Sequence, residues 1–392
     1  MIIVGAGPGG SNAARVALDG GLSVVQLDAR RFPRVKPCAG GITRKAERAL
    51  ALELAPSVRG RSRSIEFNFW RKRTNRFTDD EAIVSFVCRA EFDQDLVRQN
   101  GRRGRFEFFD GERVERITYD GLFHVRTTKR TLSARQLVGA DGAYSVVNRT
   151  FRIAKPRGLA TALEVNVARS RLAASARFVP CVDYGVLPEG YGWIFPKDDQ
   201  LSIGLYTLRP KVEHLRERLV EYMASKGALP SGDPLDGFEA HRIPVGGFGQ
   251  RAPAAPVYVV GDAAGLADAL TGEGIYHALE SGRIAGETLC AVATGRASHR
   301  SYYRRLWRSV LSDTTLTYAL ARQFHRDTER GMRLLENPLI WRPLTYGYSR
   351  GATFTGCVLR GAQYFARSLS RTTCHKASWR EARADRDFCL GA

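Results

Sequence analysis

Short apolar runs that stop at glycine or aspartate recur along this chain and give its strongest pattern. The first run, Met1–Val4, leads into Gly5–Gly10, and the second, Val24–Leu27, ends at Asp28. Small apolar residues between positions 13 and 18 have the spacing of one face of a helix. The pattern predicts a strand, a helix and a second, parallel strand at the start of the chain.

Two later runs have the same form. Leu137–Gly139 stops just before Asp141 and Gly142, and Val257–Val260 stops at Gly261 and Asp262. Asp-Gly alone is an ordinary turn signal, so the interpretation of the first of these two runs depends on its similarity to the other runs. After the second, glycines at 272 and 274 precede a helical pattern that begins at Ile275. All four runs are expected to be neighbours in one sheet.

The middle and the end of the chain have different patterns. Apolar and polar residues alternate over Thr161–Val167, and a further strand is predicted over Leu201–Tyr206. Such alternation is typical of an antiparallel sheet with one buried face. From residue 299 onward the pattern is mainly helical, with Pro338 and Pro343 marking a break.

The predicted fold class is therefore α/β (α+β overall), with a Rossmann-like domain, an inserted antiparallel sheet and a helical C-terminal region. The Rossmann-like domain is expected to be discontinuous, because its strands come from separate parts of the chain. We assign residues 1–60, 80–150 and 255–298 to this domain, 61–79 and 151–254 to the inserted sheet, and 299–392 to the helical region.

The glycines indicate what the first domain binds. Gly5–Gly10 matches G-x-G-x-x-G between a strand and a helix, an arrangement that brings a pyrophosphate to a helix N-terminus. Asp28 follows Gly10 by 18 residues, close to the spacing of a carboxylate that binds the adenosine ribose. Asp262 is placed to accept hydrogen bonds from ribityl hydroxyls, and the helix after Gly274 directs its positive end at the same cofactor. Together these features predict FAD.

Three longer motifs resemble the geranylgeranyl reductases, a family within the aromatic-hydroxylase-like flavoproteins. They are Lys36–Gly41, which matches K-P-C-G-G except that Ala39 replaces the commoner glycine; Tyr191–Lys197, which matches Y-x-W-x-F-P-K; and Gly261–Tyr276, which matches G-D-A-A-G…T-G-E-G-I-Y. The resemblance extends from residue 1 to about residue 300. It implies reduction of C=C bonds in a prenyl chain by hydride transfer from reduced FAD.

The resemblance also implies roles for individual residues. Cys38, Tyr191 and Trp193 are expected in the catalytic site, and Tyr191, Trp193 and Phe195 are expected to wall the substrate pocket, although aromatic residues at this spacing also suit a plain core. Arg89 resembles an arginine beside FAD, with a surface ion pair as the alternative. The residues expected to bind FAD are Gly5, Gly7, Pro8, Gly9, Gly10, Asp28, Ala29, Arg30, Cys38, Ala39, Gly40, Arg89, Asp141, Gly142, Gly261, Asp262, Gly272, Gly274 and Ile275.

Charge and cysteine content narrow the partners. The chain of 392 residues carries a net charge of +20, and from residue 296 onward it has 18 Lys and Arg against 7 Asp and Glu. Around Tyr302–Arg308 these basic residues alternate with bulky apolar ones, which favours either contact with an anionic membrane or a solvated basic face. No nucleic-acid motif is present. Seven cysteines without C-x-x-C spacing argue against disulfides and against a zinc site, so no metal is expected.

Neither a signal-peptide pattern nor an apolar run long enough to span a bilayer is present in the sequence, so we expect a cytoplasmic protein, with membrane association left open. A second dinucleotide motif is also absent, which leaves NADPH or a reduced iron–sulfur carrier as the electron donor. The alternative functions are an FAD-dependent hydroxylase, a flavin halogenase and a non-catalytic flavin- or lipid-binding protein. Halogenation is disfavoured, because halogenases carry W-x-W-x-I-P where this chain has Tyr191–Pro196.

Overall fold

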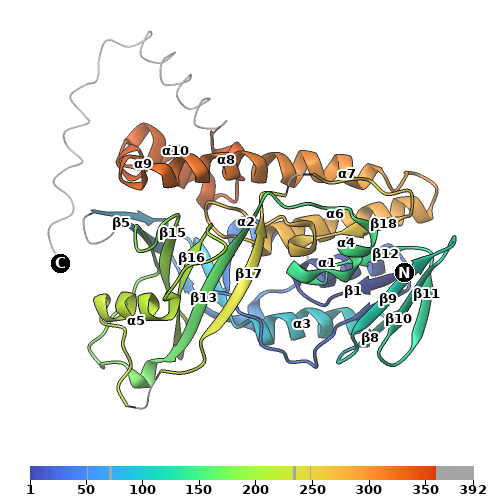
Figure 1. Cartoon of the computed structure of the whole chain (residues 1–392), viewed down its shortest axis with the longest axis horizontal. Helices are drawn as coiled ribbons and strands as arrows, with labels where there is room; N and C mark the ends of the chain where they lie inside the picture. Colours follow the sequence, from blue (N-terminus) through green and yellow to red (C-terminus); the bar gives the residue numbers. More distant parts are fainter. Residues whose placement is uncertain (51, 70–72, 233–234, 248, 359–392) are drawn as a thin grey trace, which may run out of the picture.

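A computed structural model describes residues 1–50, 52–69, 73–232, 235–247 and 249–358. Two large sheets lie side by side, and the C-terminal helices form a layer along the top of the view in Figure 1. The predicted α/β fold class is confirmed.

The first sheet is parallel and has five strands. Their order is β18-β12-β1-β2-β8, so strands from distant parts of the chain are neighbours, as the repeated apolar runs predict. Strands β1, β12 and β18 are buried on both faces, which explains why they lack the alternation of apolar and polar residues. The strands are β1 (Ile2–Val4), β2 (Val24–Leu27), β8 (Phe106–Phe109), β12 (Leu137–Gly139) and β18 (Val257–Val259).

Two helices that pack on this sheet lie close to each other. Helix α1 (Pro8–Asp19) begins directly after the glycine turn, and α6 (Ile275–Ala293) packs along it. A Cβ placed on Gly282 of α6 would lie 2.2 Å from the carbonyl oxygen of Gly9. Because this contact leaves no room for a side chain, the glycines set how closely the two helices approach.

The second sheet has seven strands in the order β17-β13-β16-β15-β14-β5-β6. All pairs are antiparallel except β14 with β5, which is parallel, so the predicted antiparallel sheet is wrong at this one pair. Strand β5 comes from an early part of the chain, far in sequence from β14, so no hairpin fixes their relative direction. The strands are β5 (Ser64–Phe69), β6 (Arg73–Thr78), β13 (Gly158–Ala168), β14 (Cys181–Tyr184), β15 (Gly190–Pro196), β16 (Gln200–Thr207) and β17 (Glu239–Val245).

Two three-stranded sheets and several short helices complete the part before residue 299. The small sheets have the orders β3-β7-β4 and β11-β10-β9. Their strands are β3 (Gly41–Thr43), β4 (Val58–Ser62), β7 (Val84–Val87), β9 (Val114–Tyr119), β10 (Phe123–Thr127) and β11 (Thr131–Ala134). The helices are α2 (Arg44–Ala49), α3 (Arg89–Gly101), α4 (Val146–Phe151) and α5 (Leu215–Ser225), with 3₁₀ turns at Ala55–Ser57, Gly142–Tyr144, Arg169–Arg171 and Gly261–Ala264.

The C-terminal layer is helical as predicted, up to the last described residue, 358. It consists of α7 (Ser301–Leu306), a π-helical turn (Trp307–Leu311), α8 (Ser312–Arg326), α9 (Thr328–Leu335) and α10 (Pro338–Ser349). The expected break lies at Pro338, which begins α10, whereas Pro343 lies inside this helix and does not interrupt it. No helix in the described ranges is both long and apolar enough to cross a membrane.

The segment from Tyr302 to Arg308 is expected from the sequence to be an exposed basic face, either in contact with a membrane or solvated, but most of its aromatic residues are buried. Tyr302, Tyr303 and Leu306 are buried, and the two tyrosine hydroxyls donate hydrogen bonds of 2.6 and 2.8 Å to carbonyl oxygens of β18. The aromatic residues of this segment therefore attach α7 to the parallel sheet. Trp307 and Arg304 remain exposed.

Candidate functional site

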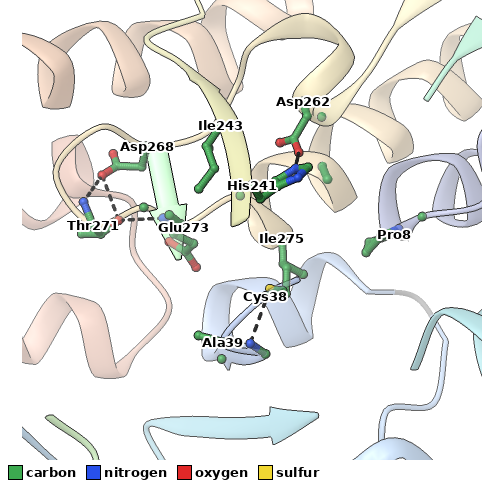
Figure 2. Close-up of a pocket in the computed structure, with 18 of the residues that line it drawn as sticks. Pro8, Cys38, Ala39, His241, Ile243, Asp262, Asp268, Thr271, Glu273 and Ile275 are labelled. Carbon is green, nitrogen blue, oxygen red and sulfur yellow. Dashed lines mark hydrogen bonds and ion pairs between the residues drawn. The ribbon is translucent and has the colours of Figure 1, made fainter. Parts of the chain in front are cut away.

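A cavity of about 1060 Å³ runs between the two large sheets. Every residue predicted to bind FAD or to wall the substrate pocket lines it, except Gly10. Gly10 instead lies within α1, where a Cβ would meet the carbonyl oxygen of Gly5 at 2.1 Å, so its small size serves helix-to-strand packing. Figure 2 shows Pro8, Cys38, Asp262 and Ile275 around one open space.

The first part of the cavity lies at the carboxyl ends of the parallel strands. Gly5 has φ +104° and faces the backbone of Ala140 so closely that no side chain fits there. The turn exposes the N-terminus of α1, whose unpaired N–H groups favour an anion. Asp28 accepts hydrogen bonds of 3.0 Å from the backbone N–H groups of Ala6 and Arg30, and Arg34 lies 3.3 Å away.

These residues fit an FAD dinucleotide. A backbone cradle without side chains suits the pyrophosphate, and the carboxylate at the end of β2 suits the ribose of the adenosine. Gly7, Pro8, Gly9 and Asp28 all line the same cavity wall. The cavity then continues past Asp262 to the second sheet, which gives room for the flavin.

Three polar groups meet where the cavity leaves the parallel sheet. The Nζ of Lys36 lies 2.6 Å from the Nε2 of His241, which is 3.9 Å from a carboxylate oxygen of Asp262. Burial lowers the pKa of Lys36 against the raising effect of Asp262. Burial acts to raise the pKa of Asp262, but the neighbouring His241 and the positive charge of Lys36 together hold that pKa below its ordinary value. Asp262 is therefore ionised and available as an acceptor.

Cys38 lies beside a buried acid. Its backbone N–H donates a 2.7 Å hydrogen bond to Oε1 of Glu164 on β13, and its sulfur accepts the N–H of Gly40 at 3.4 Å. The other carboxylate oxygen of Glu164 is buried without a hydrogen-bond partner among the described residues. Burial raises the pKa of Glu164. The cysteine loop is thus fixed to the second sheet by a carboxyl group that is costly to ionise.

Arg89 faces the same part of the cavity. It makes two hydrogen bonds, of 2.9 and 2.8 Å, to the carboxylate of the fully buried Asp93, and its own side chain is 8% exposed. The alternative of a surface ion pair is therefore wrong, because the pair is buried and Arg89 lines the cavity wall. Burial acts to lower the pKa of Arg89, but the adjacent Asp93 raises it above its ordinary value.

The loop before α6 packs directly on the second sheet. The hydroxyl of Tyr191 donates a 2.6 Å hydrogen bond to the carbonyl of Thr271, and Tyr206 donates one of 3.1 Å to Ala269. Asp268 accepts from the backbone and hydroxyl of Thr271 and holds the turn (Figure 2). This packing sets the start of α6 against the cavity.

An ion pair closes the side of this loop. Lys45 of α2 lies 2.6 Å from Glu273, which also accepts a 2.6 Å hydrogen bond from Thr43. Burial opposes the charge of Lys45, but Glu273 raises the pKa of this lysine. Because the two charges neutralise each other, the pair holds α2 against the loop before α6 at the side of the cavity.

Strand register places the remaining lining residues on one face of the second sheet. Residues opposite one another across neighbouring strands share a face and form a row across the sheet. Along the row from β17 to β5, the side chains change from charged to apolar. The row is charged at β17 and β13, where Glu239 lies opposite Glu164, and aromatic or aliphatic from β15 to β5. The apolar members of the row and of the row beside it are Trp193, Val182, Phe67, Tyr206, Tyr191 and Tyr184.

Helices α9 and α10 form the opposite wall of this apolar arm. Leu335, Trp341, Leu344 and Tyr348 all face the cavity. The ring of Trp341 meets that of Phe67 edge-on at 5.7 Å, so the helix layer touches the sheet directly. The arm is therefore enclosed between aromatic sheet residues and the C-terminal helices.

Asp141 differs from the other predicted cofactor residues. Its carboxylate accepts the N–H of Val146 at 2.7 Å and the hydroxyl of Ser145, the N-cap residue of α4, at 2.5 Å, so it supports the start of this helix. It lines the cavity while engaged in these hydrogen bonds.

Sequence reasoning missed several lining residues. Glu164 and His241 lie on β13 and β17. The pairing of these strands with β16 and β15 puts Glu164 and His241 on the same face of the sheet as Trp193, but the sequence does not reveal this pairing. For Trp341 and Tyr348 the sequence offered no signal, because only packing brings α10 to the cavity.

The comparisons with known proteins agree with this geometry. The profile of a family described as "FAD binding domain" matches residues 1–220. An uncharacterized protein of Methanosarcina barkeri is 33% identical, with 90% of this chain and 91% of that protein covered. A menaquinone reductase of Mycolicibacterium smegmatis is 30% identical (74% and 76% covered), and a digeranylgeranylglycerophospholipid reductase of Methanocella arvoryzae is 29% identical (78% and 81%).

Solved structures show the same fold. A geranylgeranyl bacteriochlorophyll reductase-like protein from Thermoplasma acidophilum superposes with a TM-score of 0.74 at 18% identity, covering 92% of this chain and 94% of that one. A probable FAD-dependent monooxygenase from Pseudomonas aeruginosa gives 0.65 at 18% identity, covering 86% and 99%. At these identities the likeness concerns the fold alone.

Proposed function

The chain belongs to the geranylgeranyl reductase family of FAD-dependent oxidoreductases, and from this premise we propose that it saturates C=C bonds in the prenyl chain of a lipid. One observation carries the proposal. A single cavity joins a polar end that fits FAD to an apolar, aromatic arm enclosed by sheet and helices. An isoprenoid chain matches such an arm, since it offers apolar surface and no hydrogen-bonding groups.

When bound, reduced FAD would supply a hydride to one alkene carbon, and a proton would add to the other carbon, so that the product gains two hydrogens. The work left to the protein is to exclude water and to align the reacting bond, because an isolated alkene is a poor electrophile. Tyr191, Trp193 and Phe195 form an apolar surface for the chain beside the loop that carries Gly272 and Gly274. The N-terminus of α6, with its unpaired N–H groups, favours negative charge on the reduced cofactor.

Cys38 is the residue we place closest to the reacting bond. It lies on the loop held by Glu164, between the charged and the apolar parts of the sheet face. We expect C38A to keep FAD and to lose alkene reduction by about 100-fold or more, the lower end of the range for one side chain that acts as a general acid or base. C38S separates the chemistry of the thiol from its volume. A C38A variant with full turnover would rule out a catalytic role.

The decisive experiment is anaerobic. Dithionite-reduced protein is incubated with prenyl diphosphates, prenylated glycerolipids and a prenylated quinone, and products are analysed by mass spectrometry for a gain of two hydrogens. Reoxidation of the flavin spectrum by one of these compounds should accompany the mass change. Oxygen-dependent consumption of NAD(P)H with hydroxylated product would instead establish the hydroxylase. Bound flavin that no lipid reoxidises would favour a binding protein.

We propose NADPH or a reduced iron–sulfur carrier as the source of electrons. Anaerobic bleaching of the flavin by NADPH alone distinguishes them, since the carrier route requires the added protein.

A further inference from the structure

The outer face of the α9–α10 helix pair has a composition that differs from its inner face. At about 3.6 residues per turn, Leu339, Arg342, Tyr346 and Arg350 fall in one stripe of α10. Trp341, Leu344 and Tyr348, which line the cavity, fall on the opposite side of the same helix. The two faces of α10 therefore have separate tasks, one turned to the cavity and one turned to solvent.

Helix α9 repeats the division. Met332 is fully buried and Leu335 lines the cavity, whereas Arg333 and Leu334 are exposed. Because the inner faces of both helices pack toward the same interior, their outer faces point away from it together. We name this outer face the α9–α10 patch and define it as Arg333, Leu334, Leu339, Arg342, Tyr346 and Arg350.

The patch exposes three large apolar side chains. Leu334 of α9 is 53% exposed, and Leu339 and Tyr346 of α10 are 60% and 56% exposed. Single exposed apolar residues are common on soluble proteins, whereas contiguous exposed apolar surface is typical of interaction sites. Arginines lie between them, the guanidinium of Arg350 stacks 3.7 Å from the ring of Tyr346, and Glu336 is an exposed acid between the helices.

We propose that the α9–α10 patch docks on a bilayer containing anionic phospholipid. Leucine and tyrosine side chains enter the boundary of the acyl region, and the arginines pair with phosphate groups at the headgroup level. The net charge of +20 attracts the protein to such a surface. Docking there places the bilayer on the outer side of α10, whose inner side lines the apolar arm. The docking proposal rests on the proposed function only for the identity of the chain that the arm receives.

The test is vesicle co-sedimentation of the full chain with bound FAD. Vesicles of phosphatidylcholine alone are compared with an equal mixture of phosphatidylcholine and phosphatidylglycerol, and the wild type should bind the mixture more tightly. R333Q/R342Q should weaken binding to the mixture about fivefold for each arginine. L339S/Y346S should weaken binding to both kinds of vesicle by about tenfold or more.

Matched controls use exposed residues away from the patch. L122S/L229S removes two leucines that are 40% and 44% exposed, and R102Q/R116Q removes two exposed arginines; neither should change vesicle binding. Flavin absorbance and circular dichroism confirm that each variant is folded. Alkene reduction in detergent micelles should be the same for the patch variants and the wild type, so a failed reductase assay does not affect the docking result.

Two outcomes would overturn the proposal. One is equal vesicle binding by the wild type and both patch variants. The other is a dimer, seen by analytical ultracentrifugation, that the patch variants dissociate while vesicle binding stays unchanged, because the patch would then be an interface between copies of this chain.

Discussion

Gly272 provides the sharpest test of how the loop before α6 is held. It has φ +70°, and a Cβ at this position would lie 2.4 Å from the hydroxyl oxygen of Tyr191. Tyr191 has little freedom to move aside, because its ring is buried and stacks on Tyr206 with centroids 4.9 Å apart. The substitution G272A should therefore break the hydrogen bond from Tyr191 to the carbonyl of Thr271.

The magnitude has two parts. Placing a non-glycine residue in the left-handed region costs about 1–2 kcal/mol. Losing the buried hydrogen bond of Tyr191 adds about 1–2 kcal/mol. We expect G272A to lower the free energy of unfolding by about 3 kcal/mol, the sum of these two costs.

A matched control isolates the backbone cost. Gly295 has φ +71°, and a Cβ added there would meet no other atom within 4 Å, so G295A should cost only the first part. Urea unfolding followed by tryptophan fluorescence gives both values. In a Y191F background, which lacks the clashing oxygen, G272A should cost no more than G295A does. If G272A and G295A cost the same in the wild-type background, the packing of this loop on Tyr191 is wrong.

Three further substitutions test other parts of the molecule. D28A should weaken FAD binding about 10- to 100-fold, because a charged acceptor for the ribose is lost, and D28N, which keeps one acceptor oxygen, should weaken it less; equal affinity of wild type and D28A in a flavin-fluorescence titration would contradict the assignment. G282A should lower the free energy of unfolding by about 1–3 kcal/mol through the clash with Gly9, whereas G101A, at a position with open space, should not destabilise. Burial lowers the pKa of His325 to about 4, and neither ring nitrogen has a hydrogen-bond partner among the described residues. As the pH falls below about 6.5, the imidazole of His325 is therefore protonated in the unfolded chain before it is protonated in the folded one. The free energy of unfolding decreases down to about pH 4, by at most about 3 kcal/mol. H325L should lack this loss when urea unfolding is compared across that range, and identical pH dependence in both proteins would refute the reasoning.

The sequence was sufficient for features that depend on local chemistry. Strand β1, the turn at Gly5 and helix α1 follow from residues that are adjacent in the chain, since apolar runs, backbone freedom and helix starts are local properties. The same holds for the turn at Asp262. Placement of Cys38 and Trp193 on the cavity wall also agrees with the motifs that contain them.

Only the tertiary structure decided which side chains meet. Glu164 reaches the loop of Cys38 because β13 lies between β16 and β17, and strand order depends on pairings that no short segment encodes. The arginines and aromatic residues of the C-terminal region looked alike in sequence. Packing separated them, turning Tyr302 into the core, Trp341 into the cavity and Tyr346 to solvent, because each helix has a face whose direction is set by its neighbours.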